Sequence, residues 1–184
     1  MPFTATDFEG LLIYEPRVFN DDRGYFFESY NENTFTAGNA AMKFVQDNQA
    51  RSTFGVIRGL HFQLAPYAQT KLIRALSGAI LDVVVDLRKG SPKYGKVFSI
   101  ELSAENKKQL LVPKGFAHGY SVLTPTAEVL YKCDAFYNKE SEGGLLYNDP
   151  MLAIDWHVPA DKALVADKDL VLPGLDNSLG NFTF

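Results

Sequence analysis

Three histidines are the only imidazoles in the 184-residue chain, and an imidazole is the usual general base near neutral pH. His61 lies in the segment GVIRGLHFQ, and His118 lies in VPKGFAHGYSVL. His157 follows Trp156 in DWHVP, where no neighbouring residue matches a site motif, so we assign it to structure. Acid–base chemistry in this chain would therefore depend on His61 or His118.

The segments around these two histidines resemble the two motifs of cupin barrels, with one departure. A metal-binding cupin needs a glycine, five residues and then His-x-His in its first motif, and here Gln63 replaces the second histidine. His118 ends the Pro-x-Gly-x-x-His pattern of the second motif. With no third histidine in a motif position, the usual three-histidine-plus-carboxylate site cannot be assembled, and a single cysteine, Cys133, excludes a thiolate-rich site. The sequence thus predicts a barrel without a metal.

The strand pattern around His61 raises a question about which way its neighbours point. Ideal alternation would place Arg58 and His61 on opposite faces of one strand. If both serve one pocket, the strand must bulge, and Gly59 is the natural place. The alternative for His61 is a hydrogen-bonded core histidine. Lys71 begins the next strand, where a solvated edge charge is the ordinary interpretation.

Two further strands carry polar side chains among apolar ones. Gln46 and Asn48 share one face of their strand, and Val129, Tyr131 and Cys133 share one face of another. Polar groups on an inward face indicate a lined cavity. Solvent-facing side chains are an equally open interpretation for either strand alone.

The elements that position these residues are short and numerous. Runs rich in Val, Ile, Tyr and Phe recur between clusters of Gly, Pro, Asn and Asp, which predicts nine or ten strands of an all-β antiparallel sandwich or barrel. Short helices are expected in residues 31–39, ended by Gly38, and in residues 158–170. With no repeat, linker or low-complexity tract, residues 1–184 are expected to form a single domain.

Charge and hydropathy exclude several classes of protein. Lys and Arg number 18 against 22 Asp and Glu, a net charge of −4, so a broadly basic surface for nucleic acid is not expected. A few arginines in one cleft can still bind an anionic ligand. No apolar run of ~20 residues predicts a membrane span, and MPFTATDFEG lacks the features of a signal peptide. We therefore expect a soluble cytoplasmic protein.

Five segments taken in order resemble the dTDP-4-dehydrorhamnose 3,5-epimerase family and cover nearly the whole chain. They are EPRVFNDDRGYFFESYN (15–31), VQDNQARSTFGVIRGLHFQ (45–63), KLIRALSGAILDVVVDLRKGSPKYGK (71–96), VPKGFAHGYSVL (112–123) and ADKD (166–169). The resemblance implies a cupin jelly-roll barrel of antiparallel strands with a few short helices. It also implies a homodimer, in which an N-terminal strand pair could exchange between subunits. The implied substrate is a dTDP-linked 4-keto-6-deoxyhexose, and no metal or cofactor is implied.

The resemblance also assigns roles residue by residue. It makes His61 the catalytic base and Asp169 the carboxylate that orients it. Lys71 is placed beside the keto oxygen, and Tyr131 is the acid on the other face of the sugar ring. The positions that bind nucleotide, diphosphate or sugar are Phe19, Arg23, Glu28, Gln46, Asn48, Arg58, His118, Glu142 and Lys168. Either Phe19 or Tyr137 is expected to stack on the thymine.

These residue types suit the implied reaction of dTDP-rhamnose biosynthesis. C3 and C5 of a 4-keto sugar both adjoin one carbonyl, so loss of either proton gives an enolate with its charge on the C4 oxygen. An epimerase acting at only C3 or only C5 is the closest alternative. A metal-dependent cupin oxygenase is disfavoured by Gln63, and a non-catalytic sugar-binding module by the presence of His61, Lys71, Tyr131 and Asp169 together.

Overall fold

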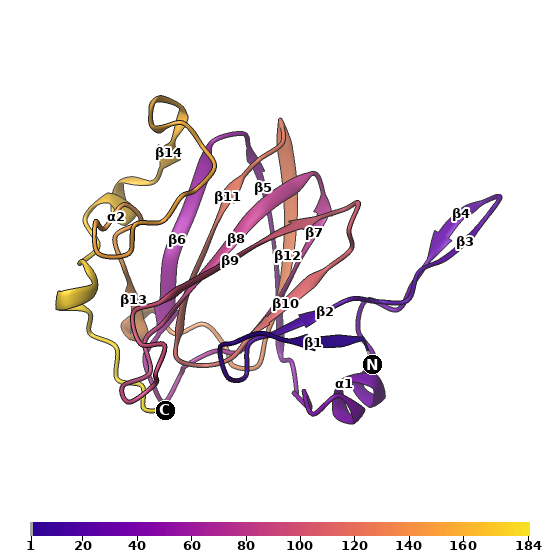
Figure 1. Ribbon diagram of the computed structural model, residues 1–184, viewed down its shortest axis with the longest axis horizontal. Helices are drawn as coiled ribbons and strands as arrows, with labels where there is room; N and C mark the ends of the chain where they lie inside the picture. Colours follow the sequence, from indigo (N-terminus) through magenta and orange to yellow (C-terminus); the bar gives the residue numbers. More distant parts are fainter. Residues whose placement is uncertain (1) are drawn as a thin grey trace.

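Short apolar strands pair into two six-stranded sheets, antiparallel except for one short parallel strand, that face each other as a barrel. The computed structural model describes residues 2–184 (Figure 1). The first sheet has the order β1 (Phe3–Ala5), β2 (Leu12–Tyr14), β10 (Gln109–Val112), β7 (Lys71–Ser77), β12 (Thr126–Cys133) and β5 (Gln46–Thr53). The second has the order β13 (Glu142–Gly144), β6 (Val56–Gln63), β11 (Phe116–Val122), β8 (Ala79–Asp86) and β9 (Val97–Ser103), with β14 (Leu164–Val165) parallel to β6. The predicted all-β class is confirmed.

Helices are few and short, as the sequence predicts. Helix α1 (Glu32–Ala37) begins after Asn31, whose side chain accepts hydrogen bonds from two backbone N–H groups, and it ends at Gly38. The expected turns near the C-terminus are the 3₁₀ helix η2 (Ala160–Lys162) and helix α2 (Asp167–Leu170). Two more 3₁₀ turns are η1 (Lys139–Ser141) and η3 (Leu175–Asn177). A separate hairpin consists of β3 (Phe19–Asp21) and β4 (Gly24–Phe26).

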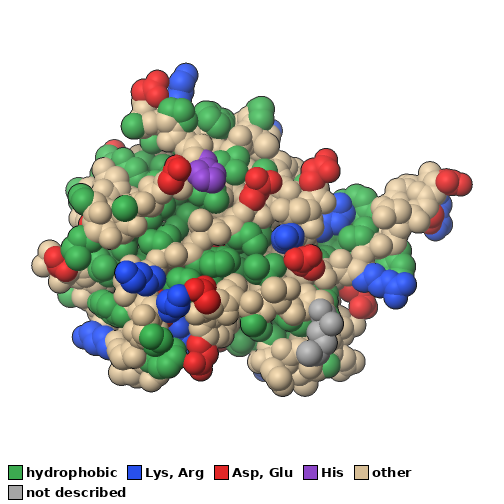
Figure 2. All heavy atoms as spheres, viewed as in Figure 1, with side chains coloured by type: hydrophobic (Ala, Val, Ile, Leu, Met, Phe, Trp, Pro, Cys, Tyr) green, Lys and Arg blue, Asp and Glu red, His purple; other side chains and the backbone are tan. Residues whose placement is uncertain are grey.

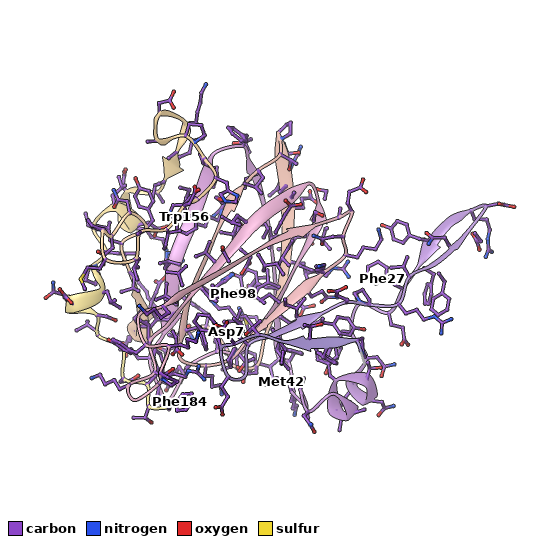
Figure 3. All side chains as sticks on the ribbon, in the orientation of Figure 1. Asp7, Phe27, Met42, Phe98, Trp156 and Phe184 are labelled. Carbon is purple, nitrogen blue, oxygen red and sulfur yellow. The ribbon has the colours of Figure 1, made fainter. Side chains whose placement is uncertain are left out.

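Apolar side chains form three layers around the two sheets. The barrel interior contains Ile73 and Val129 from the first sheet against Ile80 and Val84 from the second. The outer face of the second sheet is covered by the C-terminal segment, in which Trp156 packs on the sheet (Figure 3). Helix α1 covers the outer face of the first sheet. With both faces covered, strand β8 is almost wholly buried, which explains its long apolar run.

The sequence pattern located ten of the strands but missed four. Strands β1, β3, β13 and β14 are only two or three residues long, too short to show an alternating pattern. The run at residues 25–30 is a strand only at its start, because β4 ends at Phe26. Within residues 2–184, no helix has the length and apolar character needed to cross a membrane.

Candidate active site

A bulge in β6 turns Arg58 and His61 to the same side of the second sheet. His118 pairs with His61 and Tyr120 pairs with Arg58, so two steps along β11 lie opposite three steps along β6. Gly59 lies in the bulge with φ +117°, and a Cβ there would lie 2.6 Å from the Cα of the facing glycine of β11. Only glycine has the backbone freedom and the small size for this position. The predicted bulge is confirmed, and both side chains line one cavity.

The bulge also holds the carboxylate that pairs with His61. Strand β14 lies beside β6, and helix α2 follows it directly, which brings Asp169 to the bulge. Asp169 is buried; its Oδ1 lies 2.8 Å from Nε2 of His61, and its Oδ2 accepts the Gly59 N–H at 3.3 Å. Since a carboxylate can only accept, Nε2 donates, and Nδ1 of His61 is left as the basic atom. Burial lowers the pKa of His61, and the hydrogen bond and charge of Asp169 oppose that shift.

Lys71 and Tyr131 face His61 from the opposite sheet. They lie on the neighbouring strands β7 and β12, with the Lys71 Nζ 5.8 Å from the centroid of the Tyr131 ring. Desolvation lowers the pKa of Lys71, while Cys133 and Asp82 act to raise it. Burial raises the pKa of Tyr131 to about 12, so its phenol stays protonated at neutral pH. The cavity thus offers a base on one wall, and a cation and a proton donor on the other.

Two adjoining cavities meet at these residues. Both are lined by His61, Lys71, Tyr131 and Glu142. The smaller, about 160 Å³, is also lined by Gln46, Asn48, Phe62, Gln63, Gln69 and Tyr137. The larger, about 280 Å³, is also lined by Ala50, Arg58, His118, Gly119, Tyr120, Ala166, Lys168 and Asp169. Ten of the thirteen predicted site residues therefore surround one continuous hollow within residues 2–184.

Glu142 links two groups at the edge of this hollow. Its Oε2 accepts a hydrogen bond from the Tyr137 hydroxyl at 3.1 Å, and its Oε1 accepts one from the Lys168 ammonium at 3.3 Å. Gln46 Oε1 accepts the Tyr137 N–H at 3.1 Å, which fixes the loop that carries this exposed ring. Arg58 is exposed and is oriented by a hydrogen bond from its Nε to Ser52 Oγ at 3.1 Å. The rim is therefore polar and carries two cations.

His118 has a carboxylate partner that sequence reasoning missed. Its Nε2 lies 2.9 Å from Oδ2 of Asp82, and both residues are buried. Asp82 belongs to β8, where the sequence AILDVVVDL offers a signal: each of the two aspartates in this buried apolar strand, Asp82 and Asp86, needs a partner. His118 and His61 are directly paired residues on neighbouring strands, so two His–Asp pairs lie side by side.

The residue that departs from the metal-binding motif has a structural task. The buried Gln63 amide donates to the carbonyl oxygens of Tyr67 at 2.7 Å and Phe136 at 3.2 Å. Its Oε1 accepts the Asn138 N–H at 2.7 Å, so Gln63 anchors the loop at the cavity edge. Across residues 2–184, no group of three or more His, Cys, Asp or Glu side chains could hold a metal ion. His157 lies at a surface turn and lines neither cavity.

Three predicted site residues do not reach the cavity of their own chain. Hairpin β3–β4, which we call the arm, projects away from the barrel (Figures 1 and 2). Arg23 lies at its tip with a side chain 90% exposed, and within residues 2–184 its one salt-bridge partner is Asp21. Phe19 and Glu28 border a separate groove at the base of the arm. Phe27 marks the point where the arm leaves the barrel (Figure 3).

Known proteins resemble the chain closely in sequence and in fold. A family model described as dTDP-4-dehydrorhamnose 3,5-epimerase matches residues 5–177. The dTDP-4-dehydrorhamnose 3,5-epimerase of Shigella flexneri is 50% identical over 171 residues, which cover 92% of this chain and 93% of that protein. The crystal structure of the Elizabethkingia anophelis enzyme of the same name has a TM-score of 0.91 at 48% identity, covering 95% of this chain and 96% of that one. The dTDP-6-deoxy-D-glucose-3,5-epimerase of Legionella pneumophila, in complex with dTDP-4-keto-L-rhamnose, has a TM-score of 0.90 at 41% identity, covering 95% and 93%.

Proposed function

The chain belongs to the dTDP-4-dehydrorhamnose 3,5-epimerase family, and we propose that His61 and Tyr131 exchange the protons of its reaction from opposite walls of the barrel. The enzyme is an isomerase of dTDP-rhamnose biosynthesis that converts dTDP-4-dehydro-6-deoxy-D-glucose to dTDP-4-dehydro-L-rhamnose. The observation that carries the residue roles is the His61–Asp169 pair facing Lys71 and Tyr131 across one cavity.

The proton is removed by His61. Nδ1 takes the proton from C3 or C5, because Nε2 is committed to Asp169. The lowered pKa of His61 keeps the free imidazole neutral, and therefore able to accept a proton, at neutral pH. The Asp169 carboxylate stabilises the imidazolium that forms, as in a hydrolase triad.

The enolate is stabilised by Lys71. Negative charge develops on the C4 oxygen whichever carbon loses its proton, so one fixed donor serves both epimerisations. A cation held in a poorly hydrated wall is far more effective there than in water. Lys71 supplies that donor from the wall opposite His61; burial lowers its pKa, and the nearby carboxylates Asp82 and Glu142 act to raise the pKa and so favour the ammonium form.

Inversion requires the new proton to arrive on the opposite face of the ring. Tyr131 and His61 come from different sheets, so a ring lying between them has one group on each face. The phenol, with a pKa raised to about 12, retains its proton until a carbanion accepts it. The resulting phenolate and imidazolium return to their starting states by exchange with solvent.

The nucleotide end of the substrate is bound by the polar rim. Arg58 and Lys168 are exposed cations beside the larger cavity and would bind the diphosphate. Gln46 and Asn48 line the smaller cavity and offer amides to the base or sugar. The Tyr137 ring is fixed by two hydrogen bonds at the same cavity and is the aromatic best placed to stack on the thymine.

The arm supports a homodimer as the working form. Its projecting strands carry the exposed aromatics Phe19, Tyr25 and Phe26, an apolar surface that a second copy would cover. Among residues 2–184, the cation Arg23 at its tip has no anionic partner other than the neighbouring Asp21. We propose that the arm of each subunit completes the cavity of the other.

Mixed dimers test this arrangement. Arg23→Ala and His61→Ala should each lose activity alone, but co-expressed they should form a dimer with one cavity that has both residues intact. Activity of the mixture and twice the mass of one chain in light scattering are the expected results. A monomer, or a mixture as inactive as its parents, would disprove the exchange.

No metal or cofactor enters the proposed steps, which move only protons. Enzyme treated with a chelator should keep full activity. A loss that is reversed by adding a divalent metal would overturn this part of the proposal. We also propose that residues 1–184 work as a single domain and that the enzyme acts in the cytoplasm, as the sequence predicts.

Exchange with deuterium tests the reaction itself. Chelator-treated enzyme is incubated with dTDP-4-keto-6-deoxy-D-glucose in D₂O, and both ring positions are followed by NMR. Deuterium at C3 and at C5 is expected. Deuterium at only one position would instead identify an epimerase of one carbon, and no exchange at either position would refute both activities.

A further inference from the structure

Tyr120 carries a buried hydroxyl without a hydrogen-bond partner. The residue is 4% exposed, and within residues 2–184 its hydroxyl is one of three buried side-chain polar atoms that form no hydrogen bond. Ser52 is close enough to lower the pKa of the phenol, but no hydrogen bond of good geometry joins them, and Ser52 already accepts one from Arg58. A buried hydroxyl without a partner is costly and needs a reason.

The position of this side chain supplies the reason. Tyr120 points from β11 into the barrel, and it lines the larger cavity together with His61 and Tyr131. A phenylalanine would fill the apolar part of the site equally well. The hydroxyl oxygen therefore forms no hydrogen bond in the free protein, but it can form one when a ligand with a polar atom enters the cavity.

The location of Tyr120 in the cavity indicates which part of a nucleotide sugar its hydroxyl would contact. The charged groups suited to a diphosphate, Arg58 and Lys168, are exposed at the rim. Tyr120 is 4% exposed, and it lines the larger cavity together with His61, Lys71 and Tyr131, the residues proposed to face the sugar ring. A polar contact at this depth meets the hexose and not the nucleotide.

We propose that the Tyr120 hydroxyl hydrogen-bonds a polar atom of the substrate's hexose and so contributes to selection of the sugar. This inference rests on the proposed function, because it needs a nucleotide sugar in this cavity. A different role would act through Tyr131, whose pKa Tyr120 helps to raise. That role would change proton transfer without changing affinity.

The test compares Tyr120→Phe with Tyr30→Phe as a matched control. The Tyr30 hydroxyl donates to the Met42 carbonyl at 3.1 Å and lines neither active-site cavity. Affinities for dTDP and for dTDP-L-rhamnose, which has a hexose but no keto group, are measured by calorimetry. Thermal melting is followed in parallel.

Tyr120→Phe should bind dTDP as the parent does but bind dTDP-L-rhamnose roughly 3- to 10-fold more weakly, the effect of one hydrogen bond. Its melting temperature should not fall, whereas Tyr30→Phe should melt lower and bind both ligands normally. Unchanged affinity for both ligands, equal weakening for both, or a fall in turnover at unchanged affinity would each overturn the proposal. A parent protein that binds neither ligand would refute the proposed function as well.

Discussion

Two His–Asp pairs lie on neighbouring strands, with nearly equal hydrogen bonds of 2.8 Å for His61–Asp169 and 2.9 Å for His118–Asp82. Their surroundings differ. The His61 side chain is 28% exposed, and that of His118 is 8% exposed. Asp169 comes from the C-terminal segment, more than a hundred residues from its partner, while Asp82 lies on the strand beside His118.

Because the two pairs have similar hydrogen bonds but different exposure, a His–Asp hydrogen bond alone does not identify a catalytic base. A base must exchange its proton with solvent after each turnover, and only His61 has that access. The local pair Asp82–His118 is part of the rigid wall, where a fixed imidazole can orient a ligand. The distant pair joins the barrel to the segment that covers it, so the role proposed for His61 requires the docking of that segment.

The largest predicted loss of activity comes from replacing His61, and the same replacement at His118 should have a different effect. His61→Ala should lower kcat by ~10²–10⁴-fold and abolish deuterium exchange at C3 and C5, because His61 is the one residue proposed to remove a proton from the ring. His118→Ala should mainly raise KM and retain exchange. Steady-state kinetics and NMR in D₂O measure both. Near-normal exchange in His61→Ala would assign the base to another residue.

A smaller loss is expected when only the orienting carboxylate is changed. Asp169→Asn keeps the side-chain shape but can donate to His61 from its amide, which favours the wrong tautomer and removes the negative charge. We expect kcat to fall by roughly 10- to 100-fold with KM little changed. A loss in KM alone would show that Asp169 positions substrate and not the base.

The sequence predicted where the core strands lie along the chain because their apolar runs are long enough to show their period, but it did not predict their order in the two sheets. It predicted the bulge because Arg58 and His61, three residues apart, could share a pocket only if the strand broke its alternation at Gly59. The His61–Asp169 pairing came from family resemblance. No local pattern links a strand to a helix more than a hundred residues later.

The partner of His118 and the location of the arm residues could not be predicted from the sequence. Asp82 lies in an apolar run that predicts a buried strand, and the sequence of that run does not show what the carboxylate contacts. Its partner His118 is determined by the register between β8 and β11. Phe19, Arg23 and Glu28 carry motif signals, but the motif does not say whether these side chains reach the cavity of their own chain. Their distance from that cavity depends on the three-dimensional path of the chain.

A change in the other pair should affect stability more than chemistry. Asp82→Asn places an amide where a buried carboxylate accepts from His118, and we expect a loss of ~1–3 kcal/mol in the free energy of unfolding. The exposed pair Lys132–Asp47 supplies a control, since Asp47→Asn should cost only ~0–1 kcal/mol. Urea unfolding measures both. If kcat falls further in Asp82→Asn than in Asp169→Asn, the division between the two pairs is wrong.

The smallest effect, a shift in pH dependence, is the most specific to the His61–Asp169 pair. His61 must be neutral to act, and burial lowers its pKa below the ordinary value of 6.5, so kcat/KM should fall on acidification with a midpoint below 6.5. Asp169 acts to raise that pKa, so Asp169→Asn should move the midpoint to still lower pH even though the rate is reduced. Asp82→Asn, which leaves the partner of His61 intact, should shift the midpoint less. A midpoint above 6.5 in the parent, or an upward shift in Asp169→Asn, would mean that the group titrating in the pH–rate profile is not the buried imidazole of His61.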